Sequence, residues 1–172
     1  MKTHFADLSK RTAGTLAGII LCLLFLAGAV HASSAAPKAF ASGSLEEILA
    51  AREGKPLMLI LWSMDCSTCL KELGLLSATV RDHPDLDIVM ISTDDAAVGD
   101  QAQALLKKHR LNTIESWIFS QPNDPGLRFE IDSSWFGELP RTYFYTADHK
   151  RMALSGALQQ KHFEAWLQTI RP

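Results

Sequence analysis

The chain has 172 residues, 47% of them hydrophobic, and a formal net charge of −2 at pH 7. This length suits one domain once a leader is set aside. The nearly balanced charge, without a basic stripe, argues against nucleic acid as a partner.

The N-terminal segment is predicted to direct export. Lys2, Lys10 and Arg11 precede an almost uninterrupted apolar stretch without charge over residues 12–30, and small residues follow it. This order is typical of a secretory signal peptide. The stretch also approaches the roughly 20 residues that span a bilayer as a helix. Residues 1–32 are therefore interpreted as a cleaved signal peptide, with an uncleaved single-span membrane anchor as the alternative. Both interpretations place the rest of the chain in the periplasm.

Export makes the cysteine content informative. Of 3 cysteines, Cys22 lies in the N-terminal stretch, so the exported part has only Cys66 and Cys69. Small exported domains often use several structural disulfides. A single pair at this spacing closes only a very short loop, so it stabilises the fold little and suits disulfide exchange. Residues 1–32 carry three basic residues and one acidic residue, so the totals of 17 and 19 fall to 14 basic and 18 acidic residues. The exported part is mildly acidic.

The exported part begins with residues 33–43, which are rich in Ala and Ser. They are expected to form a linker with a brief extended piece around residues 38–41. Ser44 and Glu47 match a capping box at the start of a short helix. That helix is expected to end near Gly54, because glycine is common just past a helix C-terminus.

The next segment organises the domain. An apolar run of strand length, residues 57–62, is followed by a short polar break and by Cys66 and Cys69. Apolar residues at helical spacing come next, namely Leu70, Leu73, Leu76 and Val80. The cysteine pair therefore starts a helix that leaves the end of a buried strand. Free N–H groups and the helix dipole favour an anion there, and they lower thiol pKa values from ~8.5 to about 3.5–7.5. Cys69 is placed to resolve a mixed disulfide formed on Cys66.

The remaining elements follow in chain order after Pro84, which ends this helix. They are a strand at 86–91, a helix opened by Asp94 or Asp95, a strand at 114–119, a short helix at 127–131 after Asp124-Pro125, a loop at 135–140, a hairpin from 142 to 154, and a last helix with Phe163, Trp166, Leu167 and Ile170 on one face. Helices that alternate with apolar strands indicate an α/β fold with a central mixed β-sheet flanked by helices.

Other uses of the cysteine pair fit the sequence less well. Tetrahedral zinc needs four ligands. The exported part has no second cysteine pair, and its histidines show no paired spacing. No metal site is therefore predicted. A binding module for a soft ion such as Cu(I), held by the two thiolates, stays open as the alternative to disulfide exchange.

Two segments match a known pattern. Residues 61–69 read Leu-Trp-Ser-Met-Asp-Cys-Ser-Thr-Cys, and residues 138–144 read Glu-Leu-Pro-Arg-Thr-Tyr-Phe. They resemble the Phe-Trp-Ala-x-Trp-Cys-x-x-Cys segment and the cis-proline segment of the thioredoxin superfamily, specifically of its exported TlpA/ResA-like thiol–disulfide oxidoreductases. The resemblance implies a thioredoxin-like domain over residues 44–172, with a short insertion before the cis-proline loop. It also implies Cys66 as nucleophile, Cys69 as resolving residue, and their disulfide as the redox group, without another cofactor.

The resemblance further implies a surface that binds substrate. A cis-proline at Pro140 has no N–H, and it would leave the Leu139 backbone free to pair with an extended substrate strand. X–Pro bonds adopt the cis form more readily than other peptide bonds. Trp62 and Trp135 are candidate apolar contacts for the substrate. Trp135 is expected in a surface loop, whereas Trp62 is equally suited to the core.

Three residues depart from the family pattern. Asp65 replaces the tryptophan before Cys66, and its negative charge opposes thiolate formation. Ile60 stands where thioredoxin buries a carboxylate, so proton transfer would fall to Asp65 or Glu138. Arg141 replaces a threonine that is common after the proline, and it is the sole feature that would suit a peroxide-reducing enzyme.

The leading hypothesis is an exported oxidoreductase that exchanges disulfides with protein substrates. The resemblance implies a reductase of the cytochrome c maturation type, which keeps apocytochrome c cysteines reduced. Such a reductase needs a membrane electron donor of the DsbD/CcdA kind.

Overall fold

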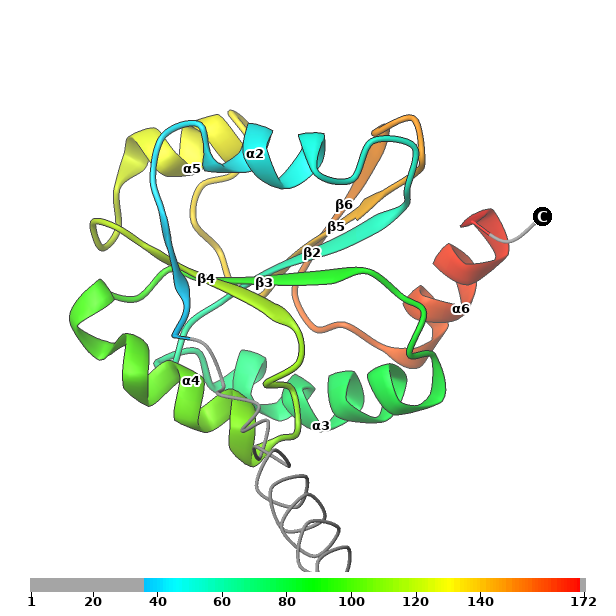
Figure 1. Ribbon diagram of the computed structural model, residues 1–172, viewed down its shortest axis with the longest axis horizontal. Coiled ribbons are helices and arrows are strands. Elements are labelled where there is room, and N and C mark those ends of the chain that lie inside the picture. Colours follow the sequence, from blue (N-terminus) through cyan, green and yellow to red (C-terminus); the bar gives the residue numbers. More distant parts are fainter. Residues whose placement is uncertain (1–35, 171–172) are drawn as a thin grey trace, which may run out of the picture. The chain divides into compact units, whose positions relative to one another are not determined.

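The computed structural model describes residues 36–170, so the predicted signal peptide or anchor lies outside the described residues. Within this range no helix has the length and apolar character needed to cross a membrane. The described chain folds around one mixed β-sheet, as the sequence predicts (Figure 1).

Six strands form this sheet in the order β1-β4-β3-β2-β5-β6. Strands β1, β4, β3 and β2 run parallel, β5 is antiparallel to β2, and β6 is antiparallel to β5. The bounds are β1 Lys38–Phe40, β2 Leu57–Trp62, β3 Ile88–Ser92, β4 Glu115–Phe119, β5 Arg141–Tyr145 and β6 Arg151–Ser155. The predicted hairpin is therefore confirmed as β5 and β6.

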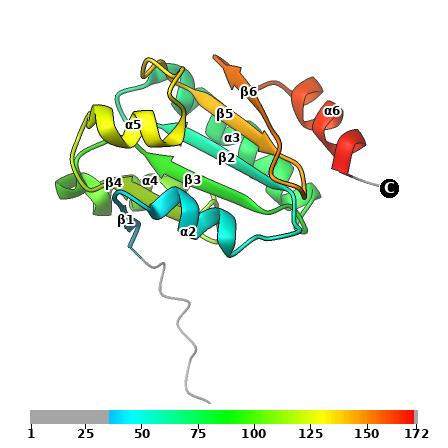
Figure 2. The ribbon, with the colours of Figure 1, turned by 90° about the horizontal axis from the view of Figure 1, so that it is seen from above.

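Helices cover both faces of the sheet (Figures 1 and 2). Helices α2 and α5 pack on one face, and α3, α4 and α6 pack on the other. The bounds are α2 Ser44–Ala50, α3 Ser67–Asp82, the 3-10 helix η2 Ala96–Val98, α4 Gly99–Lys108, α5 Pro125–Ile131 and α6 Gln160–Ile170. This arrangement gives two apolar cores, one on each side of the sheet.

The central strand β2 joins the two cores. All six of its side chains are buried. Because successive side chains of a strand point to opposite faces of the sheet, three of them enter each core. Leu57, Leu59 and Leu61 enter the core under α2 and α5, whereas Met58, Ile60 and Trp62 enter the core under α3. A strand covered on both faces explains the continuous apolar run in the sequence.

The start of α2 differs from the prediction. The N-cap is Gly43, with φ 86°, and no side chain caps the helix. The Ser44 hydroxyl instead accepts the N–H of Ala41 at 3.0 Å, and Glu130 accepts the N–H of Gly43 at 2.7 Å. The predicted capping box is therefore wrong, because the helix is capped one residue earlier and the N–H of Ser44, the group that Glu47 would bind, donates to the Ala41 carbonyl at 3.0 Å.

Other boundaries move by a few residues. Helix α2 ends at Ala50, and turns carry the chain to Gly54, whose φ is 73°. Asp95 caps η2 through the N–H of Ala97 at 2.8 Å, and α4 begins only at Gly99. The brief extended piece expected within the linker forms β1, which pairs with β4 in the register Phe40↔Phe119.

Candidate active site

The cysteine pair lies where β2 leaves the sheet and α3 begins. Asp94, which follows β3, holds the connecting loop in place. It accepts the Ser63 hydroxyl at 2.6 Å, the Met64 N–H at 2.9 Å and the Ser92 hydroxyl at 2.6 Å. The sequence identifies Asp94 only as a candidate helix start, because nothing local indicates that neighbouring parallel strands bring it to this loop.

Cys66 and Cys69 form a disulfide. Cys66 is the N-cap residue of α3, and its Sγ accepts the N–H of Cys69 at 3.1 Å. Cys66 is half-buried, whereas Cys69 is buried with 2% of its surface exposed. An incoming sulfur can therefore reach Cys66, and Cys69 can react only from inside.

The peptide bond between Leu139 and Pro140 is cis, as the resemblance implies. Strand β5 starts at the next residue, and Arg141 pairs with Leu61 near the end of β2. This register brings the proline to the edge where the cysteine loop begins. Within residues 36–170 the Leu139 backbone N–H and C=O make no hydrogen bond. Both groups are therefore free to pair with another extended chain.

The two tryptophans are more buried than binding residues would be. Trp62 is 2% exposed and packs in the core under α3. Trp135 is 4% exposed, and its indole N–H donates to the Glu138 carbonyl at 2.8 Å. The surface position favoured for Trp135 is therefore wrong, since the loop supplies both a core position and a hydrogen-bond acceptor for the ring. The exposed aromatic residue of this loop is Phe136, with 93% of its surface exposed.

The polar residues that flank the proline form a network that joins the buried Asp132 and Arg141 to exposed residues. The Arg141 guanidinium donates to Asp132 at 2.8 Å and to Glu138 at 3.2 Å, and it also donates to Ser155. Burial acts to raise the pKa of Glu138, but the hydrogen bond from Ser155 and the charge of Arg141 outweigh it and hold that pKa below its ordinary value. Glu138 is therefore ionised at neutral pH and poorly suited to donate a proton. The contacts of Arg141 are structural and offer no support for peroxide chemistry.

A buried carboxylate that the sequence reasoning missed lies on α3. Glu72 is 5% exposed and follows Cys69 by three residues, so the two side chains share the inner face of the helix. Burial raises the pKa of Glu72 to about 7, although the backbone N–H of Leu158, which donates to this carboxylate, acts to lower it. A usable signal was present, because Glu72 interrupts the otherwise apolar inner face of α3. Asp65, the other proton-transfer candidate, is exposed beside Cys66.

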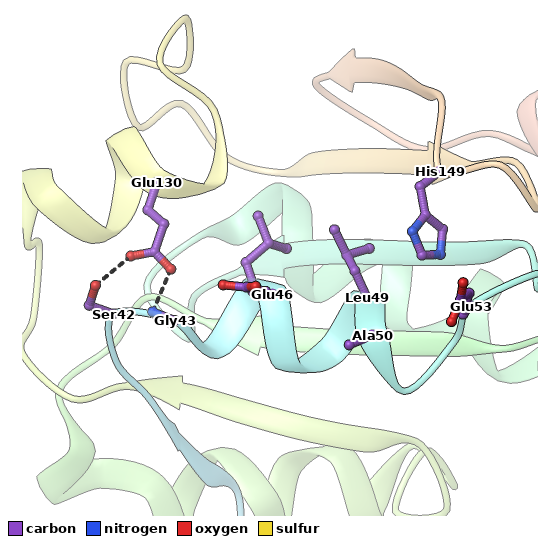
Figure 3. A pocket seen from close by; sticks show the side chains of 9 residues that line it. Ser42, Gly43, Glu46, Leu49, Ala50, Glu53, Glu130 and His149 are labelled. Atoms are coloured by element: carbon purple, nitrogen blue, oxygen red, sulfur yellow. Dashed lines mark hydrogen bonds between the residues drawn. The ribbon is translucent and has the colours of Figure 1, made fainter.

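The described residues enclose a small cavity near the cysteine loop and a larger hollow beside α2. A cavity of about 310 Å³ is lined by Asp65 and Leu139, so it adjoins both the cysteine loop and the proline loop. A larger hollow of about 710 Å³ lies between α2 and the β5–β6 turn, and its lining includes Glu130 and His149 but no residue of the cysteine loop or the proline loop (Figure 3). The smaller cavity is therefore the one that belongs to the candidate active site.

Among residues 36–170 no group of three or more histidine, cysteine, aspartate or glutamate side chains is arranged to hold a metal ion. The chemistry that the described groups offer is that of the sulfur pair. A half-exposed disulfide at a helix N-terminus, beside a cis-proline and on a mixed sheet covered on both faces, defines a thioredoxin-like fold. The predicted fold class is confirmed.

Solved structures agree with this assignment. The chain is similar to a secreted disulfide oxidoreductase of Mycobacterium tuberculosis that is homologous to E. coli DsbE, with 22% identity, a TM-score of 0.56, and coverage of 70% of this chain and 86% of that one. It is also similar to a DsbF homologue of Corynebacterium diphtheriae, with 18% identity, a TM-score of 0.56, and coverage of 71% of this chain and 76% of that one. A third similar structure is StoA of Bacillus subtilis, with 16% identity, a TM-score of 0.51, and coverage of 66% of this chain and 83% of that one. No protein-family model and no curated protein matches the chain.

Proposed function

We propose that this protein is an exported thiol–disulfide oxidoreductase that exchanges disulfides with protein substrates. One observation carries the proposal, namely the disulfide between the half-exposed helix cap Cys66 and the buried Cys69. An inert structural disulfide needs no exposed sulfur, whereas exchange needs one accessible sulfur and one protected resolving sulfur.

In the reducing direction, the Cys66 thiolate attacks one sulfur of a substrate disulfide. The substrate S–S bond breaks, its second sulfur leaves as a thiolate that takes up a proton, and a mixed disulfide remains on Cys66. Cys69 then loses its proton and attacks the Cys66 sulfur, which releases the first substrate sulfur as a thiolate. Two electrons have passed from the protein dithiol to the substrate, and the protein ends as the disulfide.

Local groups assist both steps. The N–H of Cys69 and the start of α3 stabilise negative charge on the Cys66 sulfur. Glu72, on the same inner face as Cys69, is the base that takes the Cys69 proton, because a pKa of about 7 suits proton transfer near neutral pH. Asp65 opposes the negative charge on Cys66 and so tempers its reactivity.

The reductase direction, the export and the electron donor belong to the same proposal. A related fold in a secreted oxidoreductase supports export, and the sequence resemblance supports a reductant supplied by a membrane donor of the DsbD/CcdA kind. Leu139 and Pro140 would hold the substrate chain, and the buried Trp62 and Trp135 would support that surface from beneath.

The test is the reduction potential of the Cys66–Cys69 pair, measured at equilibrium in glutathione and dithiothreitol buffers. A value near about −270 mV, as in thioredoxin, is expected for a reductase. A value near about −120 mV would instead make the protein a donor of disulfides. A pair that forms no disulfide across the whole range would refute the proposed function.

A further inference from the structure

The cavity beside the disulfide has an acidic lining. Asp65 enters it from the loop before Cys66, and Asp94 and Asp95 enter from the end of β3. Arg128 of α5 is the cation of the lining, and within residues 36–170 it forms no ion pair. The three carboxylates therefore face the cavity with one guanidinium among them, which leaves an excess of negative charge.

The hydrogen bonds of these carboxylates do not cancel their charge. Asp94 accepts two hydroxyl groups and one backbone N–H, and Asp95 accepts the N–H of Ala97 at 2.8 Å. All of these donors are neutral. Arg128 instead lies along Gly137, with its Cδ only 3.4 Å from the place that a Cβ on Gly137 would occupy.

An exposed aromatic side chain stands on the loop that supplies the other wall. Phe136 is 93% exposed, yet its neighbour Trp135 is buried and Gly137 lines the cavity. An exposed aromatic ring between two ordered residues offers a large apolar contact area to a bound chain. The unpaired backbone of Leu139 lies on the same loop. One incoming chain can therefore meet an aromatic contact, a free backbone edge and an acidic hollow.

We propose that this surface selects cysteines in extended polypeptide segments that carry both an apolar side chain, for Phe136, and a lysine or arginine, for the cavity lined by Asp65, Asp94 and Asp95. The inference rests on the proposed function, since it names the substrate class for the same sulfur pair. The surface prefers a basic residue because the cavity is acidic, and it prefers an apolar residue because the ring of Phe136 is exposed.

The experiment uses three peptides, each with a disulfide between two cysteines. The peptides differ only at one position beside that disulfide, where they carry lysine, glutamine or glutamate. Rate constants for their reduction by the reduced protein are divided by the rates with dithiothreitol, which also attacks as a thiolate but has no protein surface, so that the intrinsic reactivity of each peptide cancels. The lysine peptide is expected to react roughly fivefold faster than the glutamate peptide at low salt. In 0.5 M salt the ratio should approach one, because the Debye length falls to about 4 Å.

Two variants and one matched control locate the effect. Asp95→Asn removes a charge but keeps an oxygen for the Ala97 N–H, and it is expected to reduce the lysine-to-glutamate ratio about twofold. Glu164→Gln removes an exposed charge on α6, outside the cavity lining, and is expected to leave the ratio unchanged. Phe136→Ala should slow peptides with an apolar residue near the cysteine more than peptides without one.

A small uncharged disulfide, hydroxyethyl disulfide, separates the substrate preference from the proposed oxidoreductase function. If the protein reduces this compound but reduces all three peptides at equal corrected rates, the substrate preference is overturned and the oxidoreductase function stands. If the protein reduces neither the compound nor any peptide, the proposed function fails and the preference fails with it.

Discussion

Replacing Glu72 with glutamine tests the buried carboxylate directly. Glutamine keeps the shape of the side chain and an oxygen that can accept the N–H of Leu158, and it removes the titration. In the folded protein burial raises the pKa of Glu72 from 4.5 to about 7. This difference corresponds to roughly 3 kcal/mol between the neutral and the charged side chain.

The pH at which this free energy matters follows from the direction of the shift. Below pH 4.5 both the folded and the unfolded chain hold the Glu72 proton, so the favourable contribution of the neutral side chain is fully present. Between pH 4.5 and about 7 the unfolded chain releases the proton while the folded chain keeps it, and stability falls as the pH rises. Above pH 7 the folded protein carries a buried charge.

Glu72→Gln should therefore change the free energy of unfolding little at pH 4 and raise it by up to about 3 kcal/mol at pH 8. Urea denaturation of the oxidised protein at these two pH values measures both numbers, and Glu164→Gln on the exposed face of α6 serves as the control. The reasoning is refuted if Glu72→Gln has the same effect at both pH values, or if the variant is less stable than the wild type at pH 8.

The same variant reports on catalysis. If Glu72 takes the proton of Cys69, the glutamine variant should still form the mixed disulfide on Cys66 but resolve it more slowly. The pH profile of the resolving step should then lose the inflection near pH 7 that the wild type shows. A gain in stability together with an unchanged pH profile would restrict Glu72 to a structural role.

Three further predictions concern single residues near the site. Cys69→Ser should accumulate a mixed disulfide between Cys66 and a protein substrate, seen as a covalent adduct on a non-reducing gel, whereas Cys66→Ser should give none. Asp65→Asn should speed alkylation of the reduced Cys66 near pH 7 by about threefold, because a neighbouring negative charge no longer opposes the thiolate; slower alkylation would contradict this account. Asp132→Asn should lower the free energy of unfolding by roughly 3 kcal/mol, since it removes the buried carboxylate partner of the Arg141 guanidinium and leaves it only the exposed Glu138, and a loss below about 1 kcal/mol in urea denaturation would show that the pair is not needed.

The parts of this protein that sequence reasoning predicts well are those with local causes. The apolar run of β2 and the three- and four-residue spacing in α3 depend on neighbours in the chain, and Cys66 caps the start of that helix as predicted. Asp124 and Pro125 likewise place the start of α5 correctly, because Asp124 accepts the N–H of Gly126 at 2.6 Å.

The parts that it misses depend on distant partners. The sequence predicts an extended piece at residues 38–41 but not its pairing with β4, which makes it strand β1. The N–H of Gly43 binds Glu130, a residue 87 positions away, so no local capping pattern could reveal that bond. The spacing in α3 puts Glu72 on its inner face, but the partner of this carboxylate, the Leu158 N–H, lies 86 positions away and has no local signal. In each case the missing information is a tertiary contact.

The exposure of Phe136 follows from a fixed framework around it. Asp132, at the end of α5, binds the Arg141 guanidinium at 2.8 Å and the Tyr143 hydroxyl at 3.0 Å, and so ties both ends of the connecting loop together. Within that loop Trp135 is anchored in the core by its ring and by its indole N–H. Because its neighbours are already ordered, Phe136 can meet a partner without the cost of ordering the loop first. Arg141 therefore acts on the proposed substrate surface indirectly, because its bond to Asp132 fixes the loop that presents Phe136.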